Sequence, residues 1–198
     1  MRLFVAVAIP EAHRQRLGER LRALGPASPR ARWERAEKLH LTLRFLGEVA
    51  PQRLPELEAA LAGATASASP LTVRLTAGGA FPPAGRARVL WVGAEPEAGL
   101  VTLQQAVATA VAPFAEREEG RPFRPHLTLA RCDPPWEARE VARFVSELGT
   151  PAPEPFPVTA CQLVESRLGP GGARHTGIAS FPLGGEGESR AERGEERR

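Results

Sequence analysis

The feature that most constrains this chain is a tetrapeptide that occurs twice. His-Leu-Thr-Leu stands at residues 40–43 and again, 86 residues later, at 126–129. The same interval separates Pro10 from Pro96, and each of these prolines follows an apolar segment and precedes a helical pattern. Two further strand patterns repeat at this interval, Leu3 with Val89 and Thr72 with Val158. A single shift that aligns four elements indicates a duplicated unit of strand, helix, strand, helix, strand.

The hydrophobic pattern predicts the same order of elements in both halves. We expect strands at 3–9, 38–46, 71–77, 89–92, 126–130, 158–164 and 175–183, and helices that follow Pro10, Pro51, Pro96 and Asp133. Asp133 is the expected N-cap of the last helix, with Pro134 in its first turn. Segments 63–70 and 78–85, rich in small residues, glycine and proline, are expected to be loops. Two such repeats should face each other as lobes about a pseudo-twofold axis.

The length of 198 residues suits one compact domain or two small lobes. We expect one bilobal domain over residues 1–183, with pseudo-repeats at about 1–80 and 87–183. Residues 184–198 are mostly glycine, glutamate and arginine, so we expect a charged, solvated tail there. Since no apolar run approaches the roughly 18 residues of a membrane span, we expect a soluble protein that makes no membrane contact.

The amino-acid composition excludes some kinds of catalytic site. Lys38 is the only lysine among 26 basic residues, and because the arginine bias runs along the whole chain we attribute it to composition rather than to a site. Asp133 is the only aspartate and tyrosine is absent, which excludes a pair of catalytic aspartates and a catalytic tyrosine. Cys132 and Cys161 are too few for a disulfide framework, so we expect a reducing cytoplasm and, at Cys132, a buried inert thiol.

The repeated tetrapeptide places two residue types on one face of a strand. Side chains alternate along a strand, so His40 and Thr42 point one way while the two leucines point the other, and His126 and Thr128 repeat the arrangement. Across a pseudo-twofold axis both pairs would meet in one cleft. Histidine titrates near neutrality, so one imidazole can accept a proton while the other donates one. With hydroxyl groups to hold phosphate oxygens, this set suits metal-free cleavage of a phosphoester.

Other interpretations of the two histidines stay open. A single histidine in a strand is usually a hydrogen-bonded structural residue, but two copies in register favour catalysis. A metal-dependent hydrolase would need carboxylate or further histidine ligands, which neither tetrapeptide carries. A noncatalytic RNA-binding module would keep the fold without the chemistry, and the fold by itself does not separate these hypotheses.

The chain resembles the two-histidine (2H) phosphoesterases, in particular the RNA 2′,3′-cyclic phosphodiesterases once called 2′-5′ RNA ligases. The resemblance rests on residues 1–6, on Leu-His-Leu-Thr-Leu-Arg-Phe-Leu-Gly at 39–47 and on Phe-Arg-Pro-His-Leu-Thr-Leu-Ala-Arg at 123–131, and it extends over nearly the whole chain to Leu183. It implies a bilobal α+β fold, with two antiparallel sheets flanking a central cleft and helices on the outside. It also implies a monomer that needs neither a metal nor another cofactor.

The resemblance implies an activity as well. The expected reaction is hydrolysis of the terminal 2′,3′-cyclic phosphate of RNA, or of a small cyclic nucleotide, to a 2′-phosphomonoester; 2′-5′ RNA ligation is the reverse alternative. His40 is then the proton donor, His126 is the proton acceptor, and Thr42 and Thr128 bind the phosphate. Relatives often carry a tyrosine before the last strand where this chain has His175, which leaves its substrate range open.

Arginines are the expected supporting residues. Arg131 ends the second motif, and Arg124 shares strand parity with His126. Arg44 shares the parity of His40. We expect phosphate binding from Arg131 and Arg124, because guanidinium groups form strong hydrogen bonds to phosphate.

The remaining aromatic residues and histidines receive simpler expectations. Phe81 and Trp33 are candidates to stack on a nucleobase, whereas Phe45 and Trp91 are expected in the core. His13 is expected to face solvent on the first helix, and His175 to be an ordinary strand or surface residue.

Overall fold

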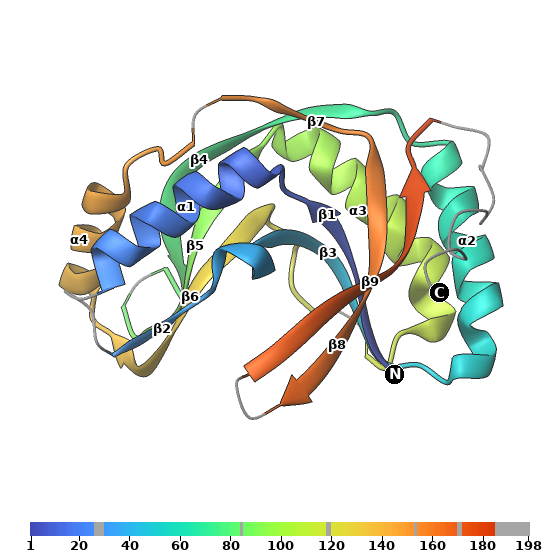
Figure 1. The fold of residues 1–198 in the computed structure, drawn as a ribbon, viewed down its shortest axis with the longest axis horizontal. Coiled ribbons are helices and arrows are strands. Elements are labelled where there is room, and N and C mark those ends of the chain that lie inside the picture. The colour runs from blue at the N-terminus through green and yellow to red at the C-terminus, as the bar shows by residue number, and fades with distance from the viewer. Residues whose placement is uncertain (26–29, 84, 118–119, 153, 170–171, 185–198) are drawn as a thin grey trace, which may run out of the picture.

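The structure is a computed structural model that describes residues 1–25, 30–83, 85–117, 120–152, 154–169 and 172–184 (Figure 1). Apart from Gly184, the expected tail at 184–198 lies outside the described residues. The strands are β1 Arg2–Ala8, β2 Ala31–Trp33, β3 His40–Glu48, β4 Leu71–Phe81, β5 Ala87–Glu95, β6 His126–Trp136, β7 Phe156–Val158, β8 Ala160–Gly169 and β9 Gly172–Pro182. The α-helices are α1 Glu11–Leu24, α2 Leu54–Ala66, α3 Glu97–Val111 and α4 Ala138–Leu148.

The strands form a curled antiparallel sheet in the order β7-β4-β5-β6-β3-β1-β8-β9, with β2 paired to β6. The pairing is the same in the two halves of the sheet. In one half β6 pairs with β5 and β5 with β4, and in the other half the equivalent strands pair in the same way, β3 with β1 and β1 with β8. One residue pair, Leu41 with Leu127, joins the two halves at β3 and β6. The α+β class and the antiparallel pairing are therefore confirmed. Each half of the sheet contains two strands of the other repeat: β2 and β4 lie with β5 and β6, and β8 and β9 lie with β1 and β3.

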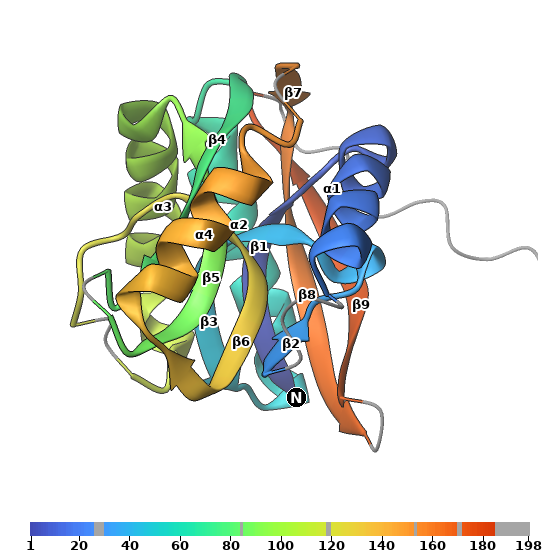
Figure 2. The same cartoon turned by 90° about the vertical axis from the view of Figure 1, so that its left-hand side faces the viewer.

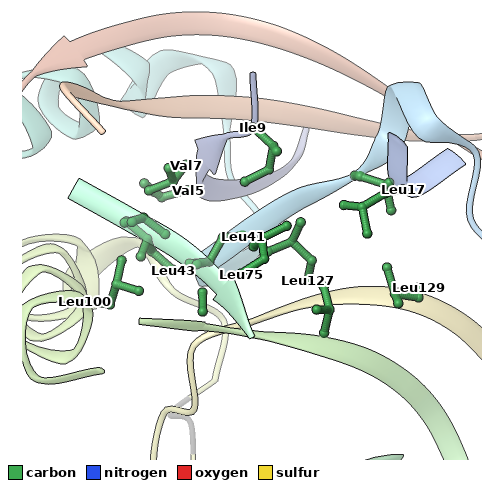
Figure 3. Packing of buried hydrophobic residues seen from close by; sticks show 14 of the residues in the cluster. Val5, Val7, Ile9, Leu17, Leu41, Leu43, Leu75, Leu100, Leu127 and Leu129 are labelled. Carbon is green, nitrogen blue, oxygen red and sulfur yellow. The ribbon is translucent and has the colours of Figure 1, made fainter. Parts of the chain in front are cut away.

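The helices cover the sheet in two pairs. Helix α2 packs against α3, and α1 packs against α4, at opposite ends of the molecule (Figures 1 and 2). Between helices and sheet lies a core in which the leucines of both tetrapeptides are almost fully buried (Figure 3). These four side chains, with relative exposures of 0 to 1%, are Leu41, Leu43, Leu127 and Leu129. Burying each one stabilises the fold by about 1.5–3 kcal/mol, so the tetrapeptides are held firmly on that side.

The expected helix start at Asp133 is wrong. Strand β6 continues through Asp133 and Pro134 to Trp136, and α4 begins only at Ala138. Glu137 caps this helix through a reciprocal capping box with Glu140, in which each side chain accepts a hydrogen bond from the backbone of the other residue. An acidic N-cap was the right type of signal, but the stronger reciprocal cap lies four residues downstream.

Two expected loops are partly regular structure. Helix α2 runs through Gly63 to Ala66, and strand β4 runs through Gly78 and Gly79 to Phe81. The ring of Trp91 on β5 would meet a side chain at position 79 within 2.3 Å, so glycine is needed inside the strand. Small residues in this part of β4 mark close packing rather than a turn. The strand expected at 158–164 is divided into β7 and β8.

The expected exposure of His13 is also wrong. Its side chain is 8% exposed on α1, and its Nε2 donates a hydrogen bond of 2.8 Å to the carbonyl oxygen of Glu154. Its ring also packs against Phe156, with ring centroids 4.7 Å apart. This histidine ties α1 to the segment before β7, a long-range contact that helical periodicity within α1 does not reveal.

Candidate active site

The two tetrapeptides lie at the starts of β3 and β6, next to each other in the middle of the sheet. Because Leu41 pairs with Leu127 in antiparallel register, His40 lies across from Thr128, and Thr42 lies across from His126. The two histidines and two threonines are half-buried on the face opposite the leucine core. Residues 86 positions apart in the chain are thus brought together on neighbouring strands, as the repeat predicts.

Both imidazoles are held by the same local hydrogen bond. Nδ1 of His40 lies 2.6 Å from the carbonyl oxygen of Lys38, and Nδ1 of His126 lies 2.6 Å from the carbonyl oxygen of Arg124. A carbonyl oxygen can only accept, so Nδ1 carries the hydrogen in both rings and donates it. In each neutral ring Nε2 is then the basic nitrogen, and it is the atom that gains or loses a proton.

Burial lowers the pKa of both imidazoles. The pKa of His40 falls to about 4, first because the ring is desolvated and further because of the charges of His175 and His126, while the hydrogen bond to Lys38 opposes the shift. The pKa of His126 is also lowered, first by burial and then by the nearby charge of Arg131, against the hydrogen bond to Arg124. The shift on His40 is the larger one. Protonated His40 is therefore the stronger acid and His126 is the stronger base.

A β-bulge follows the histidine in both repeats at the same place. On β3, Thr42 pairs with Ala6 and Arg44 with Val5, so Leu43 is an extra residue. On β6, the extra residue is Leu129, because Thr128 pairs with Trp91 and Ala130 pairs with Leu90. After each bulge the strand resumes its alternation one residue out of phase. The residue two positions beyond the bulge therefore returns to the histidine face.

This bulge overturns two expectations on β3. Arg44 does not share the face of His40: it is 6% exposed, it lies across from the core residue Val5, and it donates a hydrogen bond of 2.8 Å to the carbonyl oxygen of Arg117. Phe45 is not a core residue: it is 56% exposed and its ring lies 5.9 Å from that of Phe4, on the histidine side. A simple period of two assigns both residues to the wrong face.

On β6 the bulge brings Arg131 to the histidine face. Arg131 is exposed and occupies the place that Phe45 has in the first repeat, while buried Ala130 occupies that of Arg44. Among the described residues the guanidinium group of Arg131 has no hydrogen bond or ion pair, so it is available to an anion. Arg124 is exposed as well, but it precedes β6, and it is its carbonyl oxygen that contacts His126.

The two histidines have different aromatic neighbours. The ring of His40 stacks on Phe4 at 4.8 Å and meets His175 edge to face at 5.3 Å. Around His126 the neighbours are Phe81 at 5.0 Å and Trp91 at 6.1 Å. Trp91 is therefore half-buried beside the site rather than in the core, and the contact of His175 with His40 was missed in the sequence. In the sheet order β1 and β8 lie between β3 and β9, so the contact depends on long-range pairing of strands and no local pattern signals it.

Two further expectations concern Trp33 and Cys132, which lie away from the imidazoles of His40 and His126. Trp33 packs against Trp136 and Phe144, at 6.4 and 6.1 Å between ring centroids, beside the core and not beside either histidine of the site. Cys132 is free and buried, as expected, and burial raises the pKa of its thiol to about 11, which disfavours the reactive thiolate.

Two structural features are absent from the described residues. No group of three or more histidine, cysteine, aspartate or glutamate side chains among them is arranged to hold a metal ion. No helix in the described part of the chain has the length and apolar character needed to cross a lipid bilayer.

Comparisons with known proteins agree with this fold. A family model described as "2'-5' RNA ligase superfamily" matches residues 9–170. A protein of Thermus thermophilus named "RNA 2',3'-cyclic phosphodiesterase" is 34% identical over 194 residues, covering 94% of this chain and 92% of the relative. A crystal structure from T. thermophilus superposes with a TM-score of 0.77 at 32% identity, covering 94% of this chain and 100% of that one. The crystal structure of Escherichia coli LigT complexed with 3'-AMP superposes with a TM-score of 0.74 at 28% identity, covering 92% of this chain and 97% of that one.

Proposed function

This chain belongs to the 2'-5' RNA ligase superfamily, and from that premise we propose that it hydrolyses 2′,3′-cyclic phosphates at RNA ends or on nucleotides to 2′-phosphomonoesters. Relatives that carry the name RNA 2',3'-cyclic phosphodiesterase align over almost their whole length. The observation that carries the proposal is the pair of imidazoles on adjacent strands, each with Nδ1 bound to a carbonyl oxygen and each beside a threonine.

In this proposal the two histidines divide the proton transfers. Nε2 of His126 accepts a proton from water as the water oxygen bonds to phosphorus. Protonated His40 gives its Nε2 proton to the 3′ oxygen as the bond between phosphorus and that oxygen breaks. The order of basicity supports this division, because the more acidic imidazolium is His40. His40 gains its proton when the anionic phosphate binds, since a negative charge nearby raises the pKa of an imidazole.

The remaining polar groups would bind the phosphate. Hydroxyls of Thr42 and Thr128 donate hydrogen bonds to nonbridging oxygens, where charge accumulates in the transition state. Arg131 adds a charge-assisted hydrogen bond from the same face. Arg124 is a weaker candidate, because its exposed side chain precedes the strand.

The test is turnover of a nucleoside 2′,3′-cyclic phosphate by the purified protein, with the product identified by phosphorus NMR. We expect a 2′-phosphomonoester, and we expect His40→Ala and His126→Ala each to lower kcat by about 10²- to 10⁴-fold while the protein stays folded. His13→Ala is the matched control, since this histidine is buried away from the site. A His40 or His126 variant with near-normal turnover would refute the assignment.

The same assay separates the alternatives. Joining of two RNA ends through a 2′-5′ bond would favour ligation, and RNA binding without turnover would favour a noncatalytic module. Turnover that is lost in chelator and restored by added metal would favour a metal-dependent hydrolase.

The cellular setting forms part of the same proposal. We propose that residues 1–183 act as one bilobal domain and that the protein works as a monomer in the cytoplasm on RNA ends. Both cysteines are free and buried, which suits a reducing compartment.

A further inference from the structure

A third imidazole closes a cluster of rings around His40. The ring of Phe4 on β1 stacks on His40 at 4.8 Å and meets His175 at 5.1 Å, and the two imidazoles are 5.3 Å apart. Each ring thus touches the other two, although they come from β1, β3 and β9. His40 is fixed at Nδ1 by the carbonyl oxygen of Lys38, so these ring contacts set the direction of its free Nε2.

The surroundings of His175 disfavour its protonated form. Its Nδ1 is buried and has no hydrogen-bond partner among the described residues. A protonated ring would have to bury an N–H group there without an acceptor, which is costly. Burial and the positive charge of Lys38 lower the pKa of His175, while Glu34 raises it. The ionisable groups that act on this ring are therefore Lys38, Glu34 and His40.

The second repeat lacks a counterpart of this third imidazole. His126 contacts Phe81 and Trp91, neither of which titrates. The two catalytic candidates otherwise share strand position, bulge and Nδ1 hydrogen bond. His175 therefore makes the two halves of a nearly symmetric site unequal. It contacts His40, the proposed acid, and has no equivalent beside His126.

We propose that His175 is a positioning residue for His40: its ring, with that of Phe4, holds the imidazole of His40 in the orientation for proton donation and shields it from water. This role rests on the proposed function for the identity of the acid. The shielding itself does not depend on that function, because it concerns the free protein. It assigns His175 no contact with the substrate.

The first measurement is the pKa of His40 in the free protein by NMR titration. In His175→Ala we expect this pKa to rise by about one unit, because solvent reaches His40 once the ring that covers it is removed. The pKa of His126 should stay as it is. Thr176→Ala, an exposed neighbour on β9, is the matched control and should change nothing. An unchanged pKa of His40 in His175→Ala would overturn the proposal.

The second measurement separates positioning from substrate binding. We expect His175→Ala to lower kcat about tenfold, because a misdirected acid stabilises the transition state less. KM should stay within about twofold, because His175 does not contact the substrate. His175→Phe keeps a ring and the fold, so its loss should be smaller, about threefold. Equal losses in the two variants would mean that an imidazole nitrogen binds the substrate, and would overturn the proposal. If His40→Ala were fully active, the proposed function would fail while the NMR result still stood.

Discussion

At the scale of single residues, the site consists of two nearly identical sets of side chains, here called frames, one from each repeat. The two frames differ at a few positions. Each frame supplies an imidazole fixed at Nδ1 and a threonine hydroxyl. The differences lie beside them: Phe45 in one frame corresponds to Arg131 in the other, and only His40 has a second imidazole as a neighbour. The duplication brings two equivalent imidazoles together, and their unequal neighbours give His40 and His126 different pKa values.

The pH dependence of turnover follows from the two lowered pKa values. In the proposed mechanism His126 must be unprotonated to accept a proton, so activity is gained as pH rises. His40 must be protonated to donate one, so activity is lost as pH rises further. Because both pKa values are lowered, with His40 at about 4, we expect kcat/KM to reach its maximum below pH 6.5. The kcat profile should lie at higher pH, because the bound phosphate raises both values. A kcat/KM maximum at pH 7.5 or above would contradict this.

Arg131 provides a second residue-scale prediction. In Arg131→Gln we expect KM to rise about tenfold, since a charged hydrogen bond contributes roughly 1.5 kcal/mol or more. The pKa of His126 should rise in the same variant, because the arginine charge that lowers it is gone. Steady-state kinetics and NMR titration measure the two effects. Arg143→Gln, on an exposed side chain of α4, is the control, and an equal KM change there would show that only general charge is involved.

At the scale of elements, the β-bulges explain where sequence reasoning succeeded and where it failed. The alternation of His, Leu and Thr predicted the faces of these three residues on both strands, because they precede the bulge, and the bulge residues Leu43 and Leu129 are buried as expected. It failed at Arg44 and Phe45, because an extra residue at Leu43 changes the phase. Nothing in the local hydrophobic pattern marks such an insertion, which depends on pairing with β1. The burial of His13 and the contact of His175 with His40 also escape local analysis, because both depend on partners far away in the chain.

Deleting Leu129 would test the bulge directly. The strand would then have no extra residue, while Ala130 and Arg131 would keep Leu90 and Val89 as their partners. The deletion removes the buried side chain of Leu129 and also the local bend and twist that a bulge gives its strand. Leu129→Ala keeps the bulge and should cost about 2–5 kcal/mol in the free energy of unfolding. We expect the deletion to destabilise more than this control in urea titrations, and equal costs would argue against a structural role for the extra residue.

At the scale of the whole molecule, the repeat visible in the sequence does not correspond to two separable lobes. The 86-residue interval identified the duplicated unit, but the strand that ends each unit pairs with the other half: β4 lies beside β5, and β8 lies beside β1. The periodicity of a sequence reports which elements are equivalent, whereas strand pairing between units depends on contacts far apart in the chain. The joined sheet keeps His40 and His126 on adjacent strands, which two independently folding lobes would not ensure.

This exchange of strands predicts that neither half folds alone. If the chain is divided after residue 84, fragment 1–84 retains β1 and β4 but loses their partners β8 and β5. Each fragment also exposes apolar core surface, and burial at about 25 cal/mol per Å² is the main source of stability. We expect each fragment to give a poorly dispersed NMR spectrum, and an equimolar mixture to recover both dispersion and turnover. Fragment 85–198 has the same defect, because β8 loses β1 and β5 loses β4. A well-dispersed spectrum from either fragment alone would show that the exchanged strands are not needed, and that each repeat is a folding unit by itself.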